Sequence, residues 1–120
     1  MATPRWPVVI FDLNGTLAGT IPLIIASYQH AWRRVMGTEP DIHQARSWLG
    51  LPLRDAFALT APDDRIDDLV EQFCQFESAN LCQLGRPVGG LTPALRTLSS
   101  AGAILGVVTS KTYRSATTTL

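Results

Sequence analysis

The chain has few cysteines and few charged residues for its length. Only two of its 120 residues are cysteines, Cys74 and Cys82, and they lie eight positions apart in one expected helix. That spacing corresponds to ~12 Å of helical rise, which is too far for a disulfide. We therefore expect two reduced thiols in the core of a cytoplasmic protein. No third or fourth ligand in the sequence completes a metal site around them.

Long apolar runs and an excess of either charge are also missing. The longest apolar run beside an expected helix, residues 21–26, is far below the ~20 residues of a membrane span, and no secretory signal is visible. Ten basic and ten acidic residues give no net charge, which argues against nonspecific nucleic-acid binding. The glycine-rich loops of nucleotide-binding modules are absent as well. These absences leave one modest domain that has neither a nucleic-acid nor a membrane partner.

An apolar stretch near the start of the chain predicts a buried strand that ends in a polar turn. Val8 to Phe11 form the strand, and the turn runs from Asp12 to Thr16. Open α/β sheets bind ligands at the carboxyl ends of their strands, where Asp12 would stand. Gly15 lets the backbone turn sharply or approach an anion. Taken alone, Asp12 also fits an ordinary turn-capping residue.

Residues 19–85 predict a set of helices inserted after this strand. Apolar residues repeat at helical spacing from about residue 20 to residue 36, with Thr20 as the expected N-cap and Gly37 as the stop. Two short helices follow, the first capped by Asp41, and then a long helix whose acidic first turn complements the helix dipole. The insertion is therefore expected to be entirely helical.

A linker of two glycines and a proline, residues 86–90, follows the helices. Thr92 is the expected cap of the next helix, and residues 103–108 predict a second buried strand that runs into Thr109, Ser110 and Lys111.

The two strands would each end in polar groups. If they are parallel neighbours, the carboxylate of Asp12 lies beside the hydroxyl of Thr109 and a helix-start amide, a suitable place for a phosphate oxygen. Thr109 and Ser110 also fit an ordinary helix start, and Lys111 also fits a surface charge.

Two motifs resemble those of the haloacid dehalogenase superfamily. Residues 11–17, Phe-Asp-Leu-Asn-Gly-Thr-Leu, are similar to its nucleophile motif, and residues 107–111, Val-Val-Thr-Ser-Lys, to its second motif. The helical insertion is similar to the family's α-helical cap. The resemblance covers residues 8–120. It implies an α/β fold with a Rossmann-like parallel sheet core, here incomplete, from residues 1–18 and 86–120, and a helical cap at 19–85.

The resemblance also implies roles for the first turn. Asp12 would attack a phosphoryl group to form an aspartyl-phosphate, and it would bind Mg²⁺. Asn14 stands where phosphatases of the family carry a second Asp, which protonates the leaving oxygen and then deprotonates water. An amide does neither, although the Asn14 backbone carbonyl would still contact the metal.

Further residues match the family's binding positions. Thr109 and Ser110, with Gly15 and Thr16, would hold the phosphate. Arg54, in a Gly-Leu-Pro-Leu-Arg loop that resembles the substrate-contacting loop of the cap, would contact the rest of the substrate. Arg54 also fits a solvated helix face.

The implied function is hydrolysis of a small phosphorylated substrate, such as phosphoglycolate or pyrophosphate, with Mg²⁺. The alternative is a catalytically silent phosphate-binding or regulatory protein, which Asn14 favours. The family's later lysine and acidic pair do not occur before Leu120. We therefore expect a truncated gene product, a fragment, or one half of a fold that another chain completes.

Overall fold

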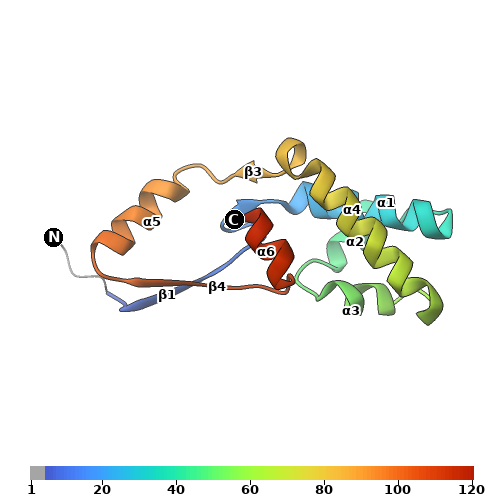
Figure 1. The fold of residues 1–120 in the computed structure, drawn as a ribbon, viewed down its shortest axis with the longest axis horizontal. Helices are drawn as coiled ribbons and strands as arrows, with labels where there is room; N and C mark the ends of the chain where they lie inside the picture. Colours follow the sequence, from blue (N-terminus) through green and yellow to red (C-terminus); the bar gives the residue numbers. More distant parts are fainter. Residues whose placement is uncertain (1–4) are drawn as a thin grey trace.

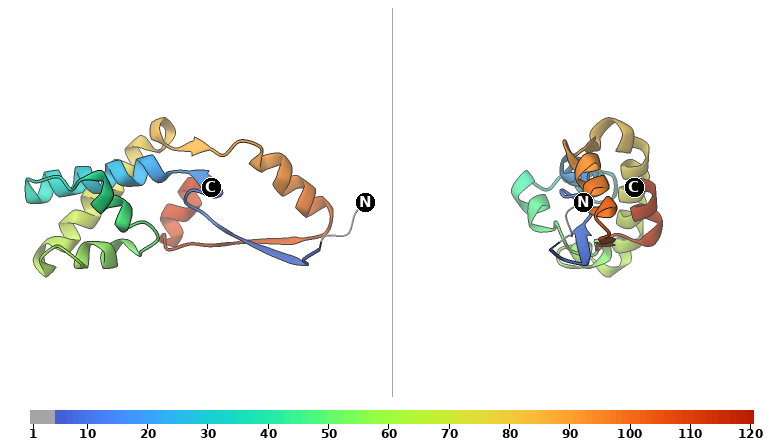
Figure 2. Two further views of the ribbon diagram at one scale, coloured as in Figure 1. Left: turned by 180° about the vertical axis from the view of Figure 1, so that it is seen from behind. Right: turned by 90° about the vertical axis from the view of Figure 1, so that its left-hand side faces the viewer.

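The computed structural model describes residues 5–120, and it is elongated, with extents of 57 × 26 × 25 Å. A sheet lies at one end and a bundle of helices at the other (Figure 1). The views in Figure 2 show the same separation from behind and from one end. No helix within residues 5–120 combines the length and the apolar character needed to cross a membrane.

The sheet confirms the expected parallel pair. Strand β1 (Val8–Asp12) pairs in parallel with strand β4 (Ile104–Val108), and Asp12 lies opposite Val108. The carboxyl ends of both strands therefore meet at the same edge. Parallel strands need a long crossover connection, and here it contains the whole helical region. The structure is accordingly α/β, as the sequence predicts.

Six α-helices and one 3₁₀-helix are present in the described residues. The four that pack into the bundle come first in the chain, with the 3₁₀-helix η1 (Asp63–Arg65) among them. They are α1 (Ile21–Met36), α2 (Ile42–Ser47), α3 (Leu53–Ala58) and α4 (Ile66–Leu84). Helix α5 (Leu91–Ser100) lies at the sheet end of the molecule, and α6 (Tyr113–Thr119) lies between the sheet and the bundle (Figure 1).

The core of the molecule sits inside the bundle. Tyr28 of α1 contacts three aromatic rings, those of Trp48, Phe57 and Phe73, at centroid distances of 5.1, 5.4 and 4.8 Å. Edge-on and tilted aromatic pairs of this kind stabilise a core beyond the area that they bury. The apolar spacing predicted along α4 places Phe73, together with Leu69, inside this core. Burial of one face of each helix therefore explains why the bundle forms.

The prediction of buried strands is wrong for both strands. Ile10 of β1 is 62% exposed and Ile104 of β4 is 67% exposed. Strands that are apolar on both faces need a layer on each face. A two-stranded sheet beside one short helix does not supply those layers within residues 5–120. The thiols also differ from the prediction, because Cys74 and Cys82 are free but exposed.

Three of the four expected helix caps are confirmed and one is wrong. The Asp41 carboxylate accepts a hydrogen bond from the Gln44 amide at 2.7 Å, and Gly37 ends α1 in the left-handed conformation. Thr20 is the N-cap residue of α1, although its side chain makes no capping hydrogen bond, and its hydroxyl donates to Asn14. Gly90, not Thr92, is the N-cap residue of α5.

A short antiparallel ladder at the base of the bundle was not predicted. Strand β2 (Ala18–Gly19) pairs with β3 (Arg86–Pro87), so the two chain segments that enter and leave the bundle lie side by side. A Cβ atom at Gly19 would lie 2.7 Å from the Arg86 carbonyl oxygen, so the pairing requires glycine. The ladder fixes how the bundle leaves the sheet.

Candidate functional site

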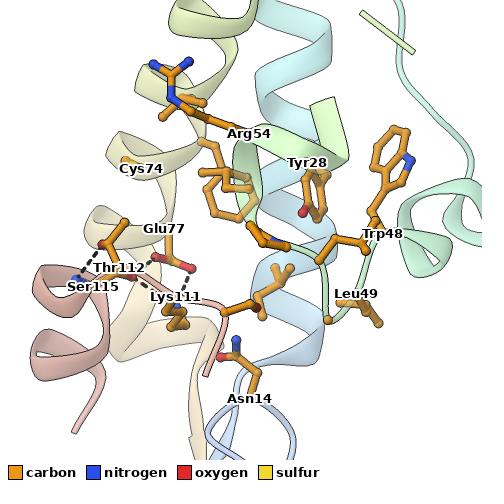
Figure 3. Close-up of a pocket in the computed structure, with 18 of the residues that line it drawn as sticks. Asn14, Tyr28, Trp48, Leu49, Arg54, Cys74, Glu77, Lys111, Thr112 and Ser115 are labelled. Carbon is orange, nitrogen blue, oxygen red and sulfur yellow. Dashed lines mark hydrogen bonds and ion pairs between the residues drawn. The ribbon is translucent and has the colours of Figure 1, made fainter. Parts of the chain in front are cut away.

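A cavity of about 490 Å³ opens between the carboxyl end of the sheet and the bundle. Figure 3 shows Asn14 at its lower end, Tyr28 and Trp48 on one side, and Glu77 and Lys111 on the other. A volume of this size is typical of small-molecule sites. The remaining lining residues are Asp12, Ile21, Ile24, Leu49, Gly50, Leu51, Pro52, Leu53, Arg54, Val70, Phe73, Cys74, Ser110, Thr112 and Ser115.

The turn after β1 places Asp12 at the mouth of this cavity. Asp12 is the last residue of the strand, and its Oδ1 atom accepts a hydrogen bond from the Leu13 amide at 2.9 Å. Leu13 is completely buried and anchors the turn. Gly15 has a φ of 76°, which favours glycine, and its amide donates to the Ala18 carbonyl at 2.7 Å. The local sequence therefore holds the carboxylate in one place.

Asn14 lines the cavity, and its side-chain oxygen is already engaged. Its Oδ1 atom accepts a hydrogen bond from the Thr20 hydroxyl at 2.7 Å. An amide has no proton to lose or gain near neutral pH, so Asn14 orients groups but does not act as an acid or a base. Thr20 is almost completely buried, which holds the Asn14 side chain in position.

Of the two polar residues directly after β4, Ser110 lines the cavity and Thr109 does not. Thr109 follows directly on the strand end beside Asp12, and its hydroxyl accepts a hydrogen bond from the Lys111 amide at 3.2 Å. Ser110 lines the cavity, whereas Thr109, Gly15 and Thr16 do not.

The expected helix-start amides are not at the end of β4. Helix α6 begins at Tyr113, and its N-cap residue is Thr112, whose hydroxyl accepts from the Ser115 amide at 3.2 Å. The interpretation of Thr109 and Ser110 as a helix start is therefore wrong, because Lys111 and Thr112 separate them from the helix. Ser110 reaches the cavity from an irregular turn.

The Gly-Leu-Pro-Leu-Arg loop lines the wall contributed by the bundle. All five residues, 50–54, border the cavity. The Arg54 guanidinium also forms an ion pair with Asp67, and its side chain is 63% exposed. Arg54 is thus partly solvated and also placed at the cavity, so the two interpretations of this residue are compatible.

The sequence analysis missed a buried ion pair in the opposite wall. The Lys111 ammonium lies 2.8 Å from the Glu77 carboxylate, and the two side chains are 8% and 10% exposed. The interpretation of Lys111 as a surface charge is therefore wrong. A signal was available, because Glu77 interrupts the apolar stripe of α4 one turn after Phe73. A charge on the apolar face of a helix indicates a buried partner.

Burial and this carboxylate alter the acidity of neighbouring groups. Burial, reinforced by the negative charge of Glu77, raises the pKa of Tyr28 to about 12 from its ordinary value of 10.0. Although Cys74 is exposed as a residue, partial burial raises the pKa of its thiol, Glu77 raises it further, and Lys111 partly offsets the rise. Both shifts therefore oppose ionisation of Tyr28 and Cys74.

The Tyr28 shift predicts a loss of stability in alkaline solution. The unfolded chain releases the phenol proton at lower pH than the folded chain, so stability is complete below pH 10 and falls as the pH rises toward 12. Absorbance titration of tyrosinate in Tyr113→Phe, which leaves Tyr28 as the single tyrosine, measures the shift. A Tyr28 ionisation near pH 10 in the folded protein would contradict it.

Oxygen donors for a hard cation are present at the sheet edge, but they are few. Within residues 5–120, no group of three or more His, Cys, Asp or Glu side chains gathers into a metal site. Asp12 has a carboxylate in the cavity lining, and the resemblance implies that the backbone carbonyl of Asn14 would be the second donor. Mg²⁺ is often held by one or two carboxylates together with substrate phosphates and water. The residues present therefore fit a Mg²⁺ ion that is shared with a phosphorylated ligand.

Comparison with known proteins places this geometry in a family. The model of the haloacid dehalogenase-like hydrolases matches residues 9–120. The chain is 32% identical over 103 residues to pyrophosphatase PpaX of Anoxybacillus flavithermus, covering 86% of this chain and 47% of that protein. It is 34% identical over 116 residues to the phosphoglycolate phosphatase of Agrobacterium fabrum, covering 91% of this chain and 50% of that protein.

The fold agrees with the sequence comparison. A hydrolase from Pseudomonas syringae superimposes with a TM-score of 0.82 at 20% identity, over 92% of this chain and 52% of that structure. The chain thus spans about half the length of the relatives that it matches. The match of the family model to nearly the whole chain confirms the resemblance found in the two motifs. The chain belongs to the haloacid dehalogenase-like hydrolase family.

Proposed function

We propose that the chain forms the nucleophile-bearing part of a phosphatase that hydrolyses a small phosphate ester or pyrophosphate. The observation that carries this proposal is the position of Asp12 at the end of β1, beside the end of β4 and at the mouth of the cavity. The names of the relatives, a pyrophosphatase and a phosphoglycolate phosphatase, support this class of substrate. In this proposal residues 19–85 form the cap, and residues 1–18 and 86–120 belong to the core.

The chemistry begins with the Asp12 carboxylate. One of its oxygens attacks phosphorus, and an aspartyl-phosphate forms as the bond from phosphorus to the leaving oxygen breaks. The leaving oxygen keeps the electron pair of that bond and takes a proton from water, because the Asn14 amide supplies none. Ser110 would hold a phosphate oxygen from within the cavity. The Thr109 hydroxyl and the backbone around Gly15 and Thr16 would hold the phosphate from the two strand ends, outside the cavity lining. Mg²⁺, when bound by the Asp12 carboxylate and the Asn14 carbonyl, neutralises phosphate charge. Water then hydrolyses the acyl phosphate, which restores the carboxylate and releases inorganic phosphate.

The bundle would recognise the rest of the substrate. Arg54 offers a cation at the cavity wall, since its ion pair with Asp67 is exposed and exchanges readily with other anions. The aromatic and aliphatic residues beside it leave room for a small organic group. This arrangement favours a substrate with a second anionic group, as both pyrophosphate and phosphoglycolate have.

The test is phosphate release from pyrophosphate, phosphoglycolate and p-nitrophenyl phosphate, each with Mg²⁺ and with excess EDTA. Binding of beryllofluoride, measured by fluorine NMR, accompanies each assay. Release that depends on Mg²⁺ supports the proposal. The absence of both phosphate release and beryllofluoride binding in the presence of Mg²⁺ would overturn it.

Asn14 favours a second candidate, a phosphate-binding protein without turnover. Asn14 lines the cavity, and by resemblance its amide stands where phosphatases of the family carry an acid and base. In that case beryllofluoride would bind but no phosphate would be released. Regulation by phosphate occupancy, not hydrolysis, would then be the function.

Asn14→Asp is expected to raise the rate of phosphate release. A carboxylate has nearly the same shape as the amide and still accepts the hydrogen bond from Thr20, so the turn is retained. General acid and base catalysis contributes ~100-fold or more. Initial rates of phosphate release for the wild type and the variant measure this gain. Equal rates would show that the missing acid is not what limits turnover.

A further inference from the structure

Three polar side chains from separate parts of the chain meet in one wall of the cavity (Figure 3). Glu77 comes from α4, Lys111 from the turn after β4, and Ser115 from α6. The Lys111 ammonium donates to Glu77 at 2.8 Å and to Ser115 at 3.2 Å. The Ser115 hydroxyl donates to the second carboxylate oxygen of Glu77 at 2.8 Å. Both oxygens of the carboxylate are therefore engaged.

Stability alone does not account for this cluster. Both charged side chains are about nine-tenths buried. Taking two charges out of water costs as much as their attraction returns, and apolar pairs of similar volume are often equally stable or better. Losing one partner, by contrast, leaves a buried unpaired charge. A pair of this kind fixes the relative position of the elements that carry it.

The cluster joins the bundle to the end of the sheet. Across residues 5–120, the hydrogen bonds that connect α4 with residues 109–119 all end on Glu77. Lys111 also reaches in the other direction, because its backbone amide donates to the Thr109 hydroxyl at 3.2 Å. Lys111 therefore contacts the bundle through its side chain and the end of β4 through its backbone amide.

We propose that Glu77 is a positioning residue for the anion site. It holds the Lys111 side chain, and through Lys111 it fixes the Thr109 hydroxyl and the Ser110 turn where a phosphate oxygen would bind. The inference rests on the proposed function, in that it takes this turn as the phosphate site. Lys111 and Ser115 occupy both carboxylate oxygens of Glu77, so Glu77 acts on the anion site through Lys111.

The experiment compares the whole chain with Glu77→Gln and with Glu71→Gln, a matched change at an exposed site on the same helix. The amide signal of Lys111 is followed by ¹H–¹⁵N NMR, first without ligand and then during titration with inorganic phosphate in the presence of Mg²⁺. We expect Glu77→Gln to shift the Lys111 amide and to weaken phosphate binding ~10-fold or more. Glu71→Gln is expected to change neither.

A second variant separates positioning from folding. Glu77→Leu/Lys111→Met replaces the ion pair by apolar side chains, and we expect the urea midpoint of unfolding to stay at or above that of the wild type. Its phosphate affinity is expected to fall as in Glu77→Gln. Wild-type phosphate affinity in the folded double variant would overturn the positioning role.

The NMR measurement without ligand distinguishes the positioning role of Glu77 from the proposed phosphatase function. A Lys111 amide that keeps its wild-type position in Glu77→Gln would overturn the positioning role whether or not phosphate binds. A shifted Lys111 amide together with a wild-type chain that binds no phosphate would support the link from Glu77 to the turn. That second result would overturn only the assignment of the turn to phosphate.

Discussion

Asp12→Asn is expected to lower phosphate release at least ~1,000-fold, in this chain and in any longer protein that contains it. An amide is not a nucleophile toward phosphorus, so no covalent intermediate forms. The Asn side chain still accepts the hydrogen bond from the Leu13 amide, and the site is exposed, so the turn keeps its shape. Steady-state phosphate release and the urea midpoint of unfolding, measured together, separate chemistry from folding.

The matched control for this change is Asp68→Asn. Asp68 is exposed on α4 and does not line the cavity. Its replacement is expected to leave the rate unchanged. A rate in Asp12→Asn equal to that of this control would show that Asp12 is not the nucleophile, whatever the substrate.

The parts of the site that follow a strand could be predicted from the sequence. A run of apolar residues marks the strand, and the polar residues after it must lie at the strand's end. Asp12 and Thr109 were placed at neighbouring strand ends in this way, and the parallel pairing of β1 with β4 confirms that placement. In the observed register Asp12 lies opposite Val108, so the two strands end together.

The wall that contains Glu77 and Lys111 could not be predicted as readily. Glu77 and Lys111 are 34 positions apart, and their meeting depends on how α4 packs beside α6. Helical periodicity gives the face of a helix but not the neighbour that covers this face. The charge at Glu77 within an apolar stripe was the one local sign of the pair.

The exposed strands show what sequence patterns omit. Apolar content predicts that a strand prefers burial, but burial also requires other layers of the fold. Ile10 and Ile104 remain exposed because the described residues supply little to cover them. The two-residue ladder of β2 and β3 was missed for another reason: segments of two residues have no periodicity to detect.

Phe57→Ala is expected to lower the free energy of unfolding by ~3–5 kcal/mol. The ring is completely buried and packs edge-on against Tyr28 and Phe73, so its removal leaves a cavity and fewer aromatic contacts. Typical domains have a free energy of unfolding of only ~5–15 kcal/mol, so a loss of this size removes a large part of the stability. Urea unfolding followed by circular dichroism measures it.

Leu59→Ala is the matched control, because Leu59 follows α3 directly and is 65% exposed. Its replacement is expected to change the free energy of unfolding by less than ~0.5 kcal/mol. Since Phe73 also lines the cavity, disturbing this cluster is expected to weaken phosphate binding as well. A Phe57→Ala protein as stable as Leu59→Ala would show that the bundle does not depend on its aromatic core. The position of the cavity wall that contains Phe73 would then need another explanation.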